Sequence, residues 1–284
     1  MTQKWISICS EAMTSISPFA QAKAIPASDP AGFAYGNDDF IFWDMNNNPT
    51  TPGTWIGVGT VSLATWQTDH PGIITFPSGT GGSLNQIVGN MGSPINSVPP
   101  PLFSTLEKAV VRFVVMCDAL FDSNSFNGEW YVGFANVSGS SVFGGALLSY
   151  APGFTWTGPG GVPTPTPGLV CGSYTGQNIS EITETTATNF PAIVPNTWYD
   201  LIISWTPTAI NYYGAQYGTP PVLIGTHSAA TPGGPNIYTG GQYLHASNNM
   251  YTSGPNVNLY IDMVEWLFKT SETGRLLESN LLNF

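Results

Sequence analysis

The chain has 284 residues and a formal net charge of −11, with 17 Asp and Glu against six Lys and Arg. Binding to phosphate or to an anionic membrane surface needs clustered Lys and Arg, so this balance argues against both partners. No run of about 18 apolar residues is present to span a bilayer, whereas 42% hydrophobic and 13% aromatic residues suffice for a packed core. Between Arg112 and Lys269 the sequence has no Lys or Arg, so a largely uncharged polar surface is expected.

Residues 1–37 are predicted to form an N-terminal arm with a short amphipathic helix. Four residues with the spacing of one helix face carry this prediction: Trp5, Cys9, Met13 and Ile16. Ser17-Pro18 ends the helix, because the residue before a proline disfavours the helical conformation. A helix this short needs a packing partner, which is either its own domain or a neighbouring subunit.

From residue 38 to residue 268 the sequence predicts one all-β domain. Its runs are rich in β-branched and aromatic residues and are bounded by Gly, Pro, Asn and Ser. The predicted strands are residues 39–44, 55–66, 72–76, 109–117, 130–135, 146–150, 169–174, 181–186, 198–205, 209–213, 222–226 and 257–268. About a dozen short strands with almost no helix indicate an antiparallel β-sandwich or a barrel.

Alternation along two of these strands predicts their buried faces. In residues 198–205 the apolar set is Tyr199, Leu201, Ile203 and Trp205, which should face the core. In residues 259–266 both faces mix apolar and polar side chains, which suits a strand covered on both sides or one near an edge.

Several aromatic residues are predicted to lie in or beside loops, where their rings could stack on sugars or fill a pocket of a partner. One of them adjoins residues 157–168, a Gly/Pro-rich stretch that should form an exposed flap. The candidates are Trp156, Tyr212, Tyr213, Tyr217, Tyr238, Tyr243 and Tyr251. The alternative is that these rings anchor loops and the core.

Residues 269–284 form a C-terminal tail that can be helical. Leu277, Leu281 and Phe284 are spaced i, i+4, i+7, as on one face of a helix. Left exposed, they would make an unusual apolar patch, so either the domain or a partner subunit is expected to cover them.

A family resemblance comes from four short segments. Residues 196–214 resemble the W-x-x-L hairpin of concanavalin A-like (lectin, glucanase, laminin G-like) jelly rolls. Asp39-Phe40 and residues 69–80 are similar to versions of this fold in tailed-phage proteins, which usually also have a closing strand like residues 259–266. The resemblance implies a jelly-roll sandwich that is part of a virion, as a head decoration, a minor capsid protein, or a tail or fibre protein.

Departures from the enzymes of this fold argue against catalysis. Glucanases carry Glu-x-Asp-x-x-Glu on one strand, and this string does not occur. The nearest matches are Glu181 with Glu184 and Asp262 with Glu265. An offset of three places two carboxylates on opposite faces of a regular strand, so without a bulge they cannot flank a glycosidic bond.

No catalytic residue, metal site or cofactor is therefore assigned. The Asp/Asn/His cluster that holds metals in legume-type lectins has no clear equivalent. His70 and His227 are interpreted as solvated loop residues. Three widely spaced cysteines, Cys9, Cys117 and Cys171, indicate neither a disulfide framework nor a zinc site.

The leading hypothesis is a non-enzymatic virion component, assembled in the host cytoplasm, that forms a homo-oligomer and docks on other virion proteins through its arms. The alternative is a carbohydrate-binding or receptor-binding module that recognises a host-surface glycan. A polysaccharide hydrolase or lyase is the third hypothesis, and the missing carboxylate motif is the main objection to it.

Overall fold

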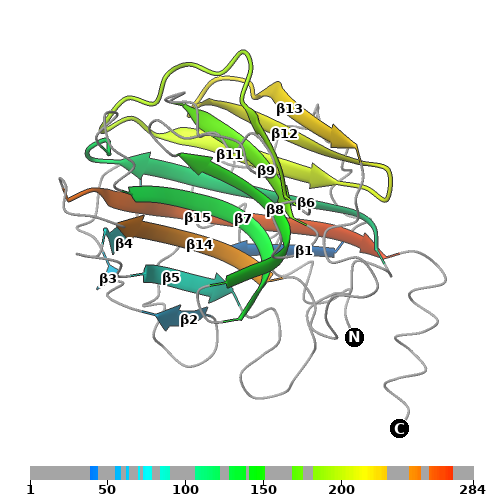
Figure 1. Ribbon diagram of the computed structural model, residues 1–284, viewed down its shortest axis with the longest axis horizontal. Coiled ribbons are helices and arrows are strands. Elements are labelled where there is room, and N and C mark those ends of the chain that lie inside the picture. The colour runs from blue at the N-terminus through cyan, green and yellow to red at the C-terminus, as the bar shows by residue number, and fades with distance from the viewer. Residues whose placement is uncertain are drawn as a thin grey trace, which may run out of the picture.

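The computed structural model describes residues 39–43, 55–58, 62–63, 70, 73–78, 84–89, 106–121, 128–138, 141–150, 168–174, 182–228, 243–250 and 256–270. Over these residues the chain forms fifteen β-strands in two antiparallel sheets (Figure 1). Both predicted arms lie almost wholly outside this part, and the last strand ends at Thr270. Among the described residues, no helix has the length and apolar character needed to cross a membrane.

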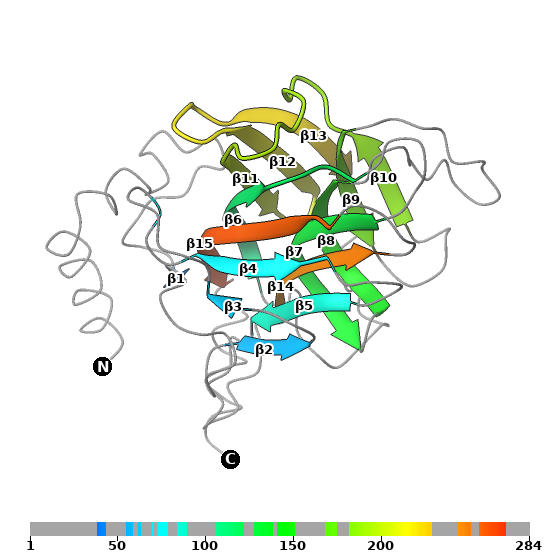
Figure 2. The same cartoon turned by 90° about the vertical axis from the view of Figure 1, so that its left-hand side faces the viewer.

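The first sheet, called sheet A, has β15 near its centre. In order across the sheet its strands are β13 (Val222–Ser228), β12 (Ala209–Gln216), β11 (Tyr199–Trp205), β6 (Leu106–Cys117), β15 (Asn258–Thr270), β4 (Ile74–Pro77) and β3 (Ser62–Leu63). An eighth strand, β1 (Asp39–Trp43), pairs with the second half of β15. Figure 2 shows β15 in red between β6 and β4.

The second sheet, called sheet B, contains the long neighbouring strands β7 and β8. Its order is β10 (Ile182–Thr186), β9 (Leu169–Tyr174), β8 (Ser141–Tyr150), β7 (Gly128–Ser138), β14 (Tyr243–Met250), β5 (Leu84–Gly89) and β2 (Trp55–Val58).

The core lies between the two sheets and is filled by alternate residues of their strands. Its largest fully buried side chains include Trp130, Trp205, Tyr212, Phe76, Phe113 and Phe134. The face of β11 predicted to be buried does enter this core, through Tyr199, Leu201, Ile203 and Trp205. An antiparallel β-sandwich is thus confirmed as the fold class.

The outer face of sheet A, which points away from sheet B, is buried as well over the central strands β11, β6 and β15. On β6 the residues that alternate with the core positions are Val110, Arg112 and Val114, and each is at most 3% exposed. On β15, Met263 and Glu265 are fully buried on the same outer face. The mixed pattern of residues 259–266 therefore reflects a central strand that is covered on both sides.

Two strands of sheet B were missed by the sequence pattern. β5 follows a Gly-rich stretch, and β14 has the polar sequence YLHASNNM. In β14, Asn248 is buried because its side-chain amide donates hydrogen bonds to the carbonyl oxygens of Phe76 (2.6 Å) and Val257 (2.8 Å). Asn248 thus links sheet B to β4 of sheet A and to the residue before β15. A buried polar residue of this kind is mistaken for a loop residue when only hydrophobic periodicity is considered.

Candidate functional site

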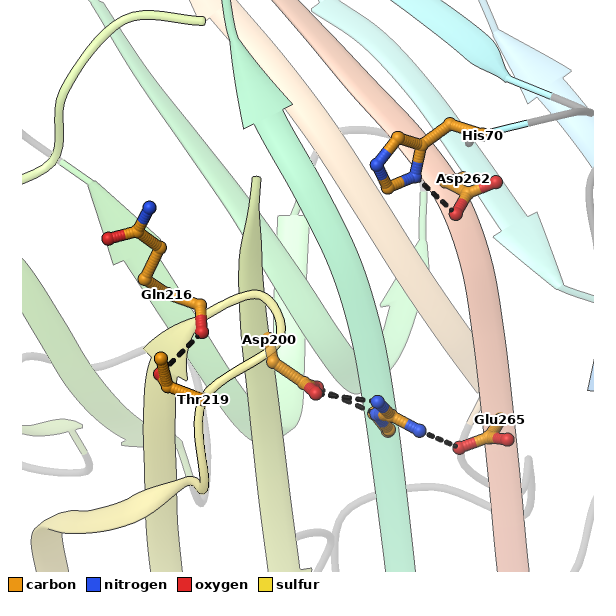
Figure 3. A network of polar contacts seen from close by, with 7 residues as sticks. His70, Asp200, Gln216, Thr219, Asp262 and Glu265 are labelled. Carbon is orange, nitrogen blue, oxygen red and sulfur yellow. Dashed lines mark hydrogen bonds and ion pairs between the residues drawn. The ribbon is translucent and has the colours of Figure 1, made fainter. Parts of the chain in front are cut away.

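A buried group of charged side chains lies on the outer face of sheet A and is called the charge cluster. It comprises His70, Arg112, Asp200, Asp262 and Glu265, each at most 7% exposed. Its centre is Arg112 on β6, flanked by Asp200 on β11 and Glu265 on β15 (Figure 3). The guanidinium donates from Nε to Asp200 Oδ1 (2.7 Å) and from Nη2 to Asp200 Oδ2 (2.6 Å). It also donates from Nη1 to Glu265 Oε2 (2.9 Å).

This arrangement uses the fork geometry of arginine, with one N–H of each guanidinium nitrogen donating to a carboxylate. The bidentate pair with Asp200 and the third bond to Glu265 are charge-assisted, which makes them the strong class of hydrogen bond. They offset the cost of removing three charged groups from water. The three residues therefore cross-link β11, β6 and β15 from the outside of the sandwich.

His70 joins the same cluster from a distant part of the chain. Its Nδ1 lies 2.8 Å from Asp262 Oδ2 on β15, and its ring stacks on Trp198 with centroids 4.2 Å apart. Tyr217, just after β12, packs against the His70 ring with the two centroids 5.2 Å apart. His70 therefore connects β15 to the residue that precedes β11 on the outer face of sheet A.

The interpretation of His70 as a solvated turn residue is wrong. Its ring is buried, and its hydrogen-bond partner Asp262 lies 192 residues later in the chain. Figure 3 shows the His70 ring pointing toward Asp262 on β15.

The strand that carries Asp262 and Glu265 is not regular, so the placement on opposite faces expected for a regular strand does not apply. A β-bulge between Ile261 and Met263 shifts the register of β15 against β6. As a result, the core residue that follows Ile261 along β15 is Val264, three positions later instead of two. Asp262 and Glu265 consequently share the outer face of sheet A. Both are 0% exposed, and each contacts a basic side chain, His70 or Arg112.

The negative charge of the cluster affects its aromatic neighbour. Burial, and then the Asp262 carboxylate, raise the pKa of Tyr217 to about 12. Arg112 opposes the shift, while Asp200 and Glu265 add to it. The Tyr217 phenol is therefore neutral at every physiological pH and cannot act as a general base.

A second polar group lies at the side of the sandwich where β9 and β10 approach β12 and β13. His227 on β13 places Nδ1 2.9 Å from Ser173 Oγ and Nε2 3.0 Å from Thr185 Oγ1. Tyr212 lies beside it and donates from its hydroxyl to the Gly172 carbonyl oxygen (2.7 Å). These contacts link sheet A to sheet B by hydrogen bonds rather than apolar packing.

The interpretation of His227 as a solvated loop residue is wrong too. It lies on β13 and is buried, and burial lowers the pKa of its imidazole below the ordinary value. A neutral ring can accept from one hydroxyl and donate to the other, which matches its two hydroxyl neighbours. Ser173 and His227 are in hydrogen-bond contact, and both are buried, with 6% and 4% of their surface exposed.

The predicted aromatic candidates are not brought together as one platform. Tyr212 is a core residue and Tyr213 is buried, so neither can stack on a sugar, and that prediction is wrong for both. Tyr217 and its neighbour Trp198 are half-buried in the stack with His70. Trp156, Tyr238 and Tyr251 lie outside the described residues, and Tyr243 is placed on β14 by its backbone alone.

The predicted docking residues also lie outside the described part of the chain. They are Trp5, Cys9, Met13, Ile16, Leu277, Leu281 and Phe284. Within that part, no group of three or more His, Cys, Asp or Glu is arranged to hold a metal ion. Cys117 and Cys171 are buried free thiols.

Comparison with known proteins identifies the fold. No protein-family model matches the chain, and no curated protein matches it. Among solved structures, a protein of unknown function from Shewanella oneidensis MR-1 superposes with a TM-score of 0.56 at 14% identity, covering 90% of this chain and 95% of that one. Peanut lectin with a 9mer peptide gives 0.52 at 8% identity, covering 82% of this chain and 98% of the lectin.

A Bacteroides ovatus mixed linkage glucan GH16 protein in complex with a product gives a TM-score of 0.50 at 9% identity, covering 80% and 99% of the two chains. The fold is a concanavalin A-like jelly roll. Because lectins and glycoside hydrolases share it, the fold by itself assigns neither activity.

Proposed function

We propose that this chain is a non-enzymatic structural component of a tailed-phage particle, a head decoration, minor capsid, or tail or fibre protein. Its jelly roll is a rigid displayed domain, and its two terminal arms dock on neighbouring subunits. The observation that supports the non-enzymatic part of the proposal is the burial of the Asp262 and Glu265 carboxylates. The bulge in β15 brings these carboxylates to one face, yet both are fully buried against His70 and Arg112.

Catalysis of glycoside hydrolysis needs two carboxyl groups that reach a bound sugar from either side of the scissile bond. A carboxylate that is fully buried and engaged by a guanidinium does not meet this requirement. The charge cluster is better understood as a structural cross-link. If purified chain released reducing sugar from β-glucan or bacterial capsule, and Glu265→Gln abolished the release, the non-enzymatic assignment would be overturned.

The particle context rests on the phage-like segments 39–40, 69–80 and 259–266 and on the charge of the chain. A surface with a net charge of −11 is repelled by packaged DNA, which favours the outside of a particle. Mass spectrometry of purified virions is the direct test, and we expect this chain among the particle proteins. Its absence from particles that are otherwise complete would end the proposal.

The role of the arms is tested separately by deletion of residues 1–30. We expect the shortened chain to keep the far-ultraviolet circular dichroism of the sandwich but to be lost from particles. A shortened chain that assembles as the full chain does would locate attachment elsewhere. A matched internal substitution, Thr208→Ala in the exposed β11–β12 turn, should assemble normally.

A second candidate function is recognition of a glycan, favoured by the likeness to peanut lectin. Trp156, beside the predicted flap, is the residue to test, because Tyr212 and Tyr213 are buried. Binding on a glycan array that Trp156→Ala abolishes and Thr208→Ala preserves would support this function. A flat array with the full chain would count against it.

A further inference from the structure

Two edge strands, β13 of sheet A and β10 of sheet B, lie beside each other at one side of the sandwich (Figure 2). Within the described part of the chain, each has one strand neighbour in its own sheet, β12 for β13 and β9 for β10. His227 on β13 links the two sheets here, with Nδ1 2.9 Å from Ser173 Oγ on β9 and Nε2 3.0 Å from Thr185 Oγ1 on β10. These two hydrogen bonds are called the His227 bridge.

The hydrogen bonds of Tyr212 determine which nitrogen of the His227 ring carries the proton. The Tyr212 hydroxyl donates to the Gly172 carbonyl oxygen (2.7 Å) and lies 3.4 Å from His227 Nδ1, so toward the ring it can only accept. The proton of the neutral ring is therefore on Nδ1, where the hydroxyl oxygens of Tyr212 and Ser173 can accept it. Nε2 carries the lone pair and accepts a hydrogen bond from Thr185 Oγ1.

The imidazole is buried among uncharged hydrogen-bond partners. His227 is 4% exposed, and burial lowers the pKa of its ring. The other titratable groups near the bridge are Tyr212, Cys171 on β9 and Glu184 on β10. Burial, and then Cys171 and Glu184, raise the pKa of Tyr212 well above its ordinary value, so this phenol stays neutral. Burial also raises the pKa of Cys171 to about 12. A proton added to the ring therefore creates a buried charge whose hydrogen-bond partners are all hydroxyl groups.

Protonation acts first on the side of the ring that faces β10. Nε2 then changes from an acceptor to a donor, so the Thr185 hydroxyl can no longer donate to it. Thr185 is exposed whereas Ser173 is buried, so water reaches the ring most readily from the β10 side. We propose that the His227 bridge is an acid-sensitive switch that holds edge strand β10 against sheet A at neutral pH and releases it on protonation.

The release is expected to stay local because the chain after β10 has its own bond to β13. The backbone N–H of Thr188 donates to the Ile224 carbonyl oxygen (2.8 Å), and this bond does not titrate. Opening β10 exposes the His227 ring, which then has the ordinary pKa of about 6.5. Since the pKa in the closed state is lower, opening becomes more favourable as the pH falls below that ordinary value. Local opening of this kind occurs at edge strands without unfolding the whole domain.

Hydrogen exchange of the full chain at about pH 7.5 and about pH 5, read by peptide mass spectrometry, tests the switch once the intrinsic pH dependence of amide exchange is removed. Relative to residues 258–265 of β15, we expect the protection of residues 182–186 to fall by about threefold or more in acid. His227→Gln should remove this extra loss, because glutamine does not titrate. Glu184→Gln is the matched control. It removes a carboxylate from β10 but keeps the imidazole, so it should respond to acid as the wild type does.

Thr185→Val tests the bridge without changing the histidine, and it keeps the test valid if His227→Gln fails to fold by circular dichroism. It removes the donor to Nε2 and should lower the protection of β10 already at about pH 7.5. The proposal would be overturned by equal losses over β10 and β15 in acid, by the same acid response in His227→Gln, or by full protection of β10 in Thr185→Val. None of these outcomes depends on whether the chain is found in phage particles.

Discussion

Arg112 binds two carboxylates at a buried position on the outer face of sheet A. Its three hydrogen bonds span 2.6 to 2.9 Å and reach two different strands. Removing the cation alone would leave Asp200 and Glu265 buried with their main counter-charge gone, and that state is more costly than a solvated pair.

We expect Arg112→Met to lower the free energy of unfolding by about 3 to 5 kcal/mol, because breaking a buried ion pair from one side leaves uncompensated charge. Urea denaturation followed by tryptophan fluorescence measures the change. Adding Asp200→Asn and Glu265→Gln to this variant removes the uncompensated charge and should recover much of the stability. A single variant that loses less than about 1 kcal/mol would show that the cluster does not hold the strands together.

His227 makes stability depend on pH in a defined direction. Its pKa in the folded protein is lowered by burial, whereas the unfolded chain has the ordinary value of about 6.5. Above the unfolded pKa the imidazole is neutral in both states. As the pH falls below it, the unfolded state takes up the proton first, so the folded state loses relative stability down to the folded pKa.

We therefore expect the free energy of unfolding of the wild type to fall between about pH 7.5 and about pH 5.5 by more than that of His227→Gln. Glutamine keeps a donor and an acceptor near Ser173 and Thr185 but does not titrate. Other groups titrate in both proteins, so the difference between the two pH profiles isolates His227. Parallel profiles would mean that this imidazole is solvated.

At the scale of single residues, local sequence patterns do not identify the side chains that form the buried polar contacts. Local sequence predicts loop positions for His70 and His227, yet each is fixed by partners from distant strands. Tyr212 lies in a W-x-x-L type hairpin whose pattern predicts a strand without saying which side faces the core. Partners separated by 192 and 153 residues, as in His70–Asp262 and Arg112–Glu265, leave no local signal.

Among the strands, the pair β7 and β8 shows how closely two backbones can approach. Gly133 on β7 lies opposite Leu147 on β8 with a φ of +156°. A Cβ added at Gly133 would collide with the carbonyl oxygen of Ala146 and lie 3.0 Å from the Cδ1 atom of Ile203. Neither neighbour is free to move, since one is backbone and the other is a core side chain.

We expect Gly133→Ala to cost about 3 kcal/mol or more in free energy of unfolding, at the upper end of overpacking effects. Gly168→Ala is the matched control, because its new methyl group would meet Thr186 Cγ2 at an ordinary 3.8 Å. The control should stay within about 0.5 kcal/mol of the wild type in the same urea experiment. Equal effects of the two substitutions would contradict the close approach at Gly133.

Most strands were predictable because alternation and turn residues are local properties of the sequence. The bulge in β15 was not, since nothing in residues 259–266 marks an extra residue, and it decides which face Asp262 occupies. The pairing order of the sheets is also absent from local patterns. That order places β15 beside β6 and β14 beside β7 and so determines which side chains meet.

For the molecule as a whole, the two buried thiols report on the integrity of the sandwich. Burial raises the pKa of Cys117 and of Cys171 to about 12, so neither is ionised at neutral pH. In a Cys9→Ser background we expect iodoacetamide at about pH 8 to leave the native protein unmodified, because the thiolate is the reactive form.

The same reagent should modify both thiols once urea has unfolded the chain, and mass spectrometry counts the added groups. Arg112→Met, which weakens sheet A, should increase the rate of modification under native conditions. Rapid labelling of the folded wild type would show that the two sheets separate more readily than their packing indicates.

The central place of β15 has a consequence for synthesis on the ribosome. Residues 258–270 pair with β6, β4 and β1, all of which are translated long before them. Until β15 has emerged from the ribosome, β6 and β4 each have an unpaired edge and exposed apolar side chains. Nascent chains in such a state are prone to aggregation. A ribosome that stops before residue 258 therefore releases a polypeptide that lacks the middle of sheet A rather than a smaller domain able to fold.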